Sequence, residues 1–151
     1  NNIRVIMDVV YNHVYNAANH SFNKTVPGYY FRYDDNGSLV NNSGCGNDTA
    51  SERKMMRKYI VDSVTYWAKN YNVDGFRFDL MGLIDTETMK EVRAALDEID
   101  PSIIILGEGW DMNTTMDEGE MTIQPNAYQV ASDGTNNGIA FFNDSVRDGL
   151  K

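Results

Sequence analysis

The chain has 151 residues, of which 42% are hydrophobic, and this is enough for one globular domain with a core of its own. Its formal net charge of −9 argues against nucleic acid and against an anionic membrane surface as partners. The single cysteine, Cys45, excludes an internal disulfide and is expected to be buried and inert. No apolar run reaches the length of a membrane span.

The first predicted element is a strand over residues 3–10, an apolar run broken only by Asp8. Such a run is typical of a strand that is buried on both faces of a parallel sheet. Because a buried charge needs a partner, Asp8 is expected to pair with Arg77 and to orient the site. Since the chain starts inside this strand and without methionine, we interpret it as an excised fragment.

A long loop is predicted over residues 14–51, which are rich in Asn, Gly, Ser and Tyr and show no helical period. The dipeptide Asn36-Gly37 predicts a hairpin turn between residues 29–31 and 39–40. A loop of this length in a compact domain is usually functional.

A helix capped by Thr49 or Ser51 is predicted to run to about residue 70, followed by a strand over residues 73–80. The helix is predicted because apolar residues recur at helical spacing on one face. These residues are Met56, Ile60, Val64, Trp67 and Tyr71.

A second helix is predicted to start at Thr86 or Thr88, with a strand over residues 103–108 after it. Its apolar face consists of Met89, Val92, Leu96 and Ile99. A polar loop over residues 111–138, a short strand over 138–142 and a helix start over 144–150 complete the chain.

Strands that alternate with helices predict an α/β fold, with a parallel sheet and right-handed crossovers. The polar residues that are candidates for a functional site lie at the carboxyl ends of strands, and the long loops follow strands. This is the pattern of a (β/α)8 TIM barrel, which carries its active site at the carboxyl ends of its strands. Only about four strands are present, so residues 1–151 are predicted to form one partial catalytic (β/α)8-barrel domain with long βα loops.

Two stretches carry the predicted chemistry. In Gly-Phe-Arg-Phe-Asp-Leu-Met-Gly over residues 75–82, Arg77 and Asp79 share one face of a strand, and the guanidinium keeps the carboxylate ionised. In Gly-Glu-Gly-Trp-Asp, Glu108 ends the next strand. An ionised Asp and a separate Glu at adjacent strand ends are the pair that cleaves a glycosidic bond. The alternatives are a structural Arg77–Asp79 ion pair and a surface glutamate.

A third stretch, Asp-Val-Val-Tyr-Asn-His over residues 8–13, closes the first apolar run. In this order the three stretches resemble the first three of the four signature regions of the α-amylase superfamily of glycoside hydrolases. Four stretches resemble most the starch-debranching members, the type I pullulanases. They are Gly-Cys-Gly-Asn-Asp over 44–48, Asp-Leu-Met-Gly over 79–82, Gly-Glu-Gly-Trp-Asp over 107–111 and Ile-Ala-Phe-Phe-Asn-Asp over 139–144, and the resemblance covers essentially the whole chain.

The resemblance implies that the four strands are the third to sixth of the barrel. It also implies hydrolysis of α-1,6-glucosidic linkages of pullulan and branched α-glucans by a retaining mechanism, with Asp79 as the nucleophile and Glu108 as the acid/base. The family's fourth signature region, with its His and third carboxylate, and an upstream Tyr are absent from this chain. We therefore expect the isolated chain to be inactive.

The resemblance also assigns substrate-binding roles. His13 is expected to hydrogen-bond the sugar, and Trp110 to stack on one. Asn47 either contacts substrate or shapes its loop, and Arg77 completes the substrate-binding set. Asn12 supports the site, as Asp8 does; it occupies a position that binds calcium in many amylases. Because debranching enzymes often lack that calcium, no metal or other cofactor is expected, and calcium stays the alternative.

Two other interpretations stay open. The chain resembles, less closely, other α-glucan enzymes of the superfamily, such as isoamylases, amylases and branching enzymes. It is alternatively a non-catalytic fragment that only binds α-glucan or associates with itself, because a partial barrel leaves open sheet edges and an uncovered apolar face. The expected partners are thus an α-glucan and further copies of the chain. The location is unknown, with an extracellular or cell-surface location favoured over a cytoplasmic one.

Overall fold

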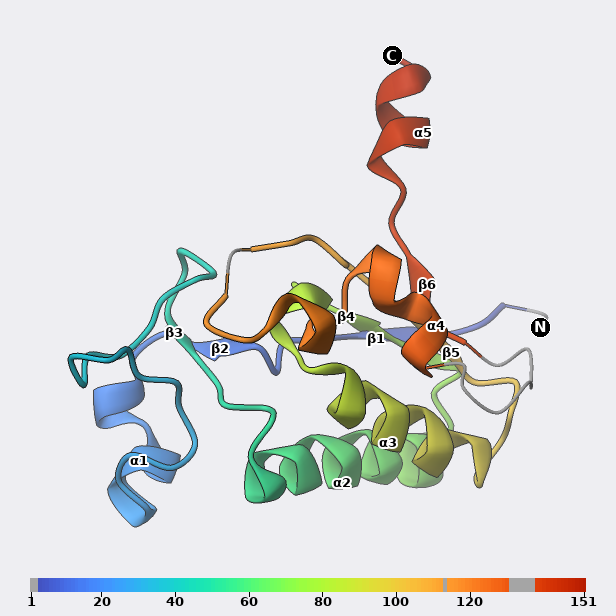
Figure 1. Ribbon diagram of the computed structural model, residues 1–151. Coiled ribbons are helices and arrows are strands. Elements are labelled where there is room, and N and C mark those ends of the chain that lie inside the picture. Colours follow the sequence, from blue (N-terminus) through green and yellow to red (C-terminus); the bar gives the residue numbers. More distant parts are fainter. Residues whose placement is uncertain (1–2, 113, 131–137) are drawn as a thin grey trace.

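A computed structural model describes residues 3–112, 114–130 and 138–151. Four strands form a parallel sheet in the order β1-β4-β5-β6 (Figure 1). Sequence order equals spatial order in this sheet, so each crossover leads to the adjacent strand. This confirms the predicted α/β class and the four parallel strands. The strands are β1 (Ile6–Val9), β4 (Gly75–Phe78), β5 (Ile104–Gly107) and β6 (Ala140–Phe141).

Two long helices, α2 (Lys54–Tyr71) and α3 (Thr86–Asp97), cover one face of the sheet (Figure 1). They bury Phe76 and Phe78, which alternate with Arg77 along β4. Burial of these apolar faces is the main force that holds helices and sheet together. The predicted stripes form most of this core, although Tyr71 is exposed. The buried helix residues are Met56, Ile60, Val64 and Ala68 from α2 and Met89, Val92 and Leu96 from α3.

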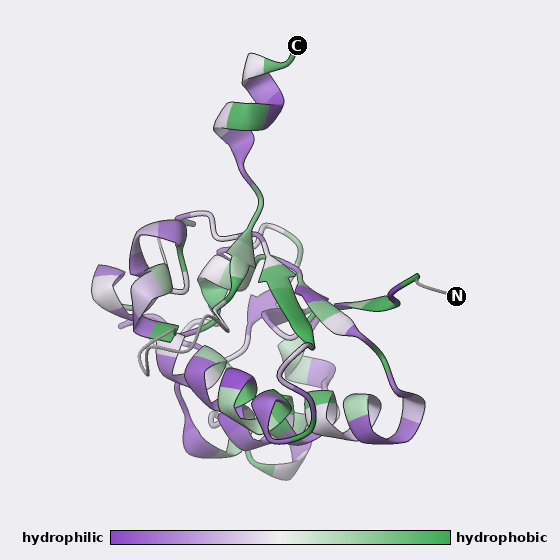
Figure 2. Ribbon diagram, turned by 90° about the vertical axis from the view of Figure 1, so that its right-hand side faces the viewer, coloured by the Kyte–Doolittle hydropathy of each residue, from purple (hydrophilic) through white to green (hydrophobic). Residues whose placement is uncertain are grey.

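The opposite face of the sheet is only half-buried. Ile6, Ile104 and Leu106 are partly accessible on this face, and Asp8 is 68% exposed. The prediction that the first strand is buried on both faces is therefore wrong for the described residues. The reason is that β1 lies at an edge of the sheet and only one face carries a layer of helices. Figure 2 shows the hydrophobic strands next to helices that mix hydrophobic and hydrophilic residues.

The two helix starts differ in how well they were predicted. Helix α3 begins at Thr86 as expected, and Asp85 caps it by accepting from the backbone N–H of Thr88. Helix α2 begins at Lys54, so neither Thr49 nor Ser51 caps it. Both side chains are instead buried and hold other segments: Thr49 Oγ1 donates to the Tyr11 carbonyl, and Ser51 Oγ accepts from the Asp85 N–H.

The segment over residues 14–51 contains short elements. Strand β2 (His13–Val14) pairs antiparallel with β3 (Asn47–Asp48), and η1 (Ala17–Asn19) and α1 (Ser21–Thr25) lie between them. The predicted turn at 36–37 forms, with Gly37 at a φ of +77°, but the residues on either side of it form isolated β-bridges rather than strands. Tyr33 pairs with Leu39, and Phe31 pairs with Thr49.

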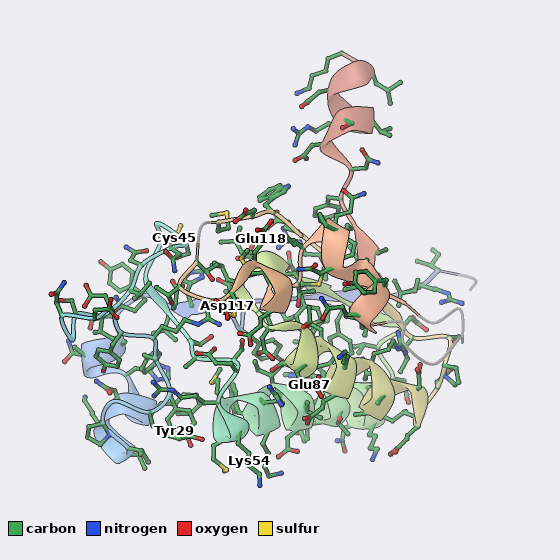
Figure 3. All side chains as sticks on the ribbon, viewed as in Figure 1. Tyr29, Cys45, Lys54, Glu87, Asp117 and Glu118 are labelled. Atoms are coloured by element: carbon green, nitrogen blue, oxygen red, sulfur yellow. The ribbon has the colours of Figure 1, made fainter. Side chains whose placement is uncertain are left out.

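Cys45 is exposed, which contradicts the predicted burial. It lies in a turn in which Ser43 accepts from its backbone N–H, and this turn projects from the segment before β3 (Figure 3). A turn on the surface leaves no apolar surroundings for the thiol.

The C-terminal third is more ordered than the predicted polar loop. It contains η3 (Glu118–Glu120), η4 (Gln124–Asn126) and α4 (Ala127–Val130), while residues 113 and 131–137 of that loop lie outside the described residues. Helix α5 (Asp144–Gly149) projects away from the body (Figure 1). No helix of the described ranges is long and apolar enough to cross a membrane.

Candidate active site

Arg77 lies among three carboxylates at the carboxyl end of the sheet. Its Nη1 donates to Asp8 Oδ1 at 3.0 Å and to Asp79 Oδ1 at 2.9 Å, and its Nη2 donates to Glu108 Oε1 at 2.5 Å. These residues belong to three adjacent strands or the positions just after them, because β1, β4 and β5 are paired in register. The expected Asp8–Arg77 pair is thus present, although Asp8 is not buried.

The charge of Arg77 is reinforced by its partners. Partial burial lowers the pKa of its guanidinium, but the hydrogen bonds to Asp79 and Asp8 and the charge of Glu108 outweigh burial, so the pKa is raised overall. Arg77 also lies over the ring of Phe142, with Cζ 5.6 Å from the ring centroid. Arg77 is therefore a fixed cation that holds the carboxylates together.

The turn after Asp79 holds Glu108. Strand β4 ends at Phe78, and Leu80 takes a left-handed conformation with a φ of +38°, which is strained for a residue with a β-carbon. Its backbone N–H donates to Glu108 Oε2 at 2.9 Å, and Gly82 N–H donates to the Glu108 carbonyl at 3.0 Å. Both oxygens of the Glu108 carboxylate are thus bound. The sequence gives no signal for this use of Leu80, since it depends on backbone geometry.

Asn12 and His13 support Asp79 from the segment that follows β1. The buried Asn12 Nδ2 donates to the Asp79 carbonyl at 2.6 Å and lies 3.3 Å from its Oδ2. Asn12 Oδ1 in turn lies 2.6 Å from His13 Nδ1. In the described ranges no group of three or more His, Cys, Asp and Glu is arranged to hold a metal ion. Through its contacts with the Asp79 carbonyl and carboxylate, the amide of Asn12 orients Asp79.

Asn47 and Trp110 are placed differently relative to the Arg77 cluster. Asn47 Oδ1 accepts from the Ala17 N–H at 3.0 Å, so its amide holds the loop. Trp110 lines a cavity of about 290 Å³ together with Glu108 and Phe142, and the other lining residues are Asn143, Asp144 and Arg147. The indole Nε1 is buried without a hydrogen-bond partner among the described residues. A larger cavity, about 530 Å³, lies on the outer side of α2 and contains none of these residues.

Comparison with curated proteins shows which proteins the chain is similar to. The chain is 48% identical over 149 residues to the pullulanase of Bacillus subtilis strain 168, and this match covers 99% of the chain and 20% of that protein. The chain is homologous to the pullulanases. A chloroplastic pullulanase of Arabidopsis thaliana is 41% identical over 158 residues, which cover 97% of the chain and 16% of the plant protein. No protein-family model matches the chain.

Solved pullulanase structures share the architecture. The pullulanase of Anoxybacillus sp. LM18-11, solved with maltotriose, has a TM-score of 0.92 and 58% identity, with 99% of the chain and 20% of that structure covered. The pullulanase of Paenibacillus barengoltzii, solved with maltohexaose and α-cyclodextrin, has the same TM-score and 51% identity, with 99% and 22% covered. The chain thus spans about a fifth of the length of the pullulanases it matches.

Proposed function

We propose that the chain is part of the catalytic domain of a starch-debranching glycoside hydrolase that cleaves α-1,6-glucosidic linkages of pullulan and branched α-glucans. One observation carries this proposal: a single guanidinium binds both Asp79 and Glu108 at the ends of adjacent parallel strands, in a chain homologous to pullulanases. The pair of carboxylates matches the needs of glycosidic cleavage.

The chemistry that we propose is a double displacement. Asp79 forms a bond to the anomeric carbon while the bond from that carbon to the leaving oxygen breaks, and Glu108 gives its proton to that oxygen. Glu108 then takes a proton from water, which attacks the same carbon and releases Asp79. A retaining mechanism of this kind places the two carboxyl groups about 5–5.5 Å apart. The shared contact with Arg77 supports such proximity.

We also propose that the four strands are the third to sixth strands of a (β/α)8 barrel, so that residues 1–151 form part of one barrel domain. Three features support this: the strands are parallel and sequential, the sheet has open edges at β1 and β6, and the polar residues gather at its carboxyl end. The half-buried face with Ile6, Ile104 and Leu106 would then point into the barrel.

The proposed ligand is an α-glucan. Relatives solved with maltotriose and maltohexaose support this class of ligand. His13, Arg77, Trp110 and Asn47 are the proposed binding residues, and no cofactor is required by the chemistry above. An extracellular or cell-surface location remains the favoured one.

The test is a chimaera in which this chain replaces the matching segment of the Anoxybacillus pullulanase. The chimaera should hydrolyse pullulan with release of reducing sugar. Asp79→Asn and Glu108→Gln should each lower kcat by several orders of magnitude, because each removes one half of the double displacement. Neither substitution changes side-chain volume much, so circular dichroism and thermal unfolding should match the unaltered chimaera.

Two controls make the outcome decisive. Asp35→Asn and Asp117→Asn, two changes of the same type at exposed positions outside the proposed site, should leave kcat within about threefold. A chimaera that is folded but inactive, or one in which Asp79→Asn keeps full activity, would contradict the proposed function. Preferential hydrolysis of amylose over pullulan would favour the alternative of an amylase.

A further inference from the structure

Arg32 is a buried arginine outside the site described above, and its side chain is only 3% exposed. Its Nη1 donates to the Leu83 carbonyl at 2.8 Å. Its Nη2 donates to Glu52 Oε2 at 2.8 Å and to Ser51 Oγ at 3.2 Å, and it lies 3.0 Å from Met116 Sδ. The guanidinium therefore joins the segment before β3 to the start of α2 and to the loops that follow β4 and β5.

One route leads from Arg32 to Glu108. Leu83 is the last residue of η2 (Met81–Leu83), the turn that follows Asp79, and its N–H donates to the Leu80 carbonyl at 2.9 Å. The N–H of Leu80 binds the Glu108 carboxylate. By holding the Leu83 carbonyl, Arg32 restrains the turn on which the orientation of Glu108 depends.

A second route leads from Arg32 to Asp79. The backbone N–H of Arg32 donates to the Asp48 carbonyl at 3.0 Å, and its Nη1 lies 3.7 Å from the fully buried Asp48 Oδ2. The next residue, Thr49, donates its N–H to the Asn12 carbonyl at 3.0 Å. Asn12 Nδ2 binds the Asp79 carbonyl. Arg32 therefore braces β3, which in turn braces the side chain that orients Asp79.

We infer that Arg32 is a positioning residue that holds Asp79 and Glu108 in register with each other, through β3 and through η2. This inference rests on the proposed function. An arginine suits the role because its planar guanidinium presents five donors in several directions, whereas a lysine has one nitrogen. Arg32→Lys keeps the positive charge opposite Asp48 and Glu52 but cannot serve Leu83, Ser51 and Glu52 together.

The test compares Arg32→Lys with Arg93→Lys in the chimaera. Arg93 is a matched control because it is 4% exposed, donates to the Ile103 carbonyl at 2.8 Å and pairs with Asp97, but lies at the amino end of the strands. Arg32→Lys should lower kcat roughly tenfold to a hundredfold, since displacements of about 1 Å have effects of this size. Arg93→Lys should change kcat by no more than about twofold, even if it lowers Tm by as much as Arg32→Lys does.

Hydrogen exchange followed by mass spectrometry supplies a second readout that needs no activity. Arg32→Lys should speed exchange over residues 47–50 and 80–84, and Arg93→Lys should not. Unchanged exchange over both segments, or equal losses of kcat in the two variants, would overturn the inference. If the unaltered chimaera is inactive, the proposed function fails, and the exchange data still decide whether Arg32 holds the two segments.

Discussion

Arg77 and Glu108 come from neighbouring parallel strands, and Nη2 of the arginine donates to Oε1 of the glutamate at 2.5 Å. The same guanidinium uses its other terminal nitrogen for Asp79 and Asp8. Because Arg77 alternates with the buried Phe76 and Phe78, the core packing of β4 sets the direction of the guanidinium. The hydrophobic core thus determines where the two proposed catalytic carboxylates meet.

Arg77→Lys should lower kcat of the chimaera at least tenfold, because one ammonium group cannot bind three carboxylates in separate directions. The stability loss should be small, about 1 kcal/mol or less, since the ion pairs are partly exposed to solvent. Steady-state kinetics and thermal unfolding measure the two effects. Arg57→Lys is the control, because Arg57 is 19% exposed against 20% for Arg77 and also pairs with two carboxylates, Asp85 and Glu91. Equal kinetic effects in both variants would argue against a special role of Arg77.

Azide should reveal the separate roles of the two carboxylates in truncated chimaeras. With an activated α-glucoside, azide should rescue Glu108→Ala with formation of the α-azide, because it attacks the covalent intermediate in place of water. It should rescue Asp79→Gly with formation of the β-azide, because it replaces the nucleophile on the opposite face. NMR of the early products distinguishes the anomers. Inversion of configuration by the unaltered chimaera would contradict the retaining mechanism.

Gly82→Ala should destabilise the chain by about 1–3 kcal/mol, the usual range for overpacking a buried site. A β-carbon at Gly82 would overlap the carbonyl oxygen of Trp110, which is backbone and cannot rotate away. Gly82 also donates to the Glu108 carbonyl, so kcat should fall as well. Urea unfolding measures the stability change. Gly119→Ala should have little effect, because a β-carbon there meets nothing within 4 Å.

Tyr11→Phe should change how stability depends on alkaline pH. Burial raises the pKa of the Tyr11 phenol above its ordinary value of 10.0. The folded state therefore favours the protonated phenol, and this stability is present below pH 10.0 and is lost as pH rises through the folded pKa. Near neutral pH the variant should be less stable by about 1 kcal/mol, because Tyr11 loses its 2.7 Å hydrogen bond with Ser63 Oγ.

Above the ordinary pKa of tyrosine, the unaltered chain should lose stability faster than Tyr11→Phe, so the difference between them should shrink or change sign. Urea unfolding at about pH 8 and about pH 11 measures this. Tyr15→Phe is the control, because Tyr15 is 90% exposed and should leave the pH dependence unchanged. A constant difference between Tyr11→Phe and the unaltered chain at both pH values would contradict this account.

The isolated chain should associate with itself and should not hydrolyse pullulan. The open edge of β1 and the exposed side chains of Ile3, Val5 and Val10 favour association. Activity should be absent because a site open to water loses electrostatic stabilisation. Sedimentation velocity should show a dimer or larger species at high micromolar concentration. An overnight pullulan assay beside the Asp79→Asn variant measures activity. A monodisperse monomer would contradict the expected association. Pullulan cleavage above the level of the Asp79→Asn control would contradict the expected inactivity.

The sequence by itself determined the order of the elements and the position of the proposed catalytic pair, Asp79 and Glu108. Period-2 and helical spacing are local properties, so the strands around Phe76 and Ile105 and the stripes of both helices could be predicted from neighbouring residues. The Arg77–Asp79 spacing put both side chains on one side of a strand, and a parallel sheet put Glu108 at the same end. The pairing of Asp8 with Arg77 was predicted from a burial of Asp8 that does not occur; the two residues meet because β1 and β4 pair in register.

Only the tertiary structure decided the contacts between segments that are distant in the chain. The binding of Glu108 by the Leu80 N–H depends on a left-handed turn, and the burial of Arg32 depends on β3, α2 and η2 coming together. Thr49 and Ser51 look like helix caps in the sequence but are drawn into bonds with Tyr11 and Asp85. The physical reason is that buried polar groups bind whichever partners the packed core brings within reach, and local propensity does not specify those partners.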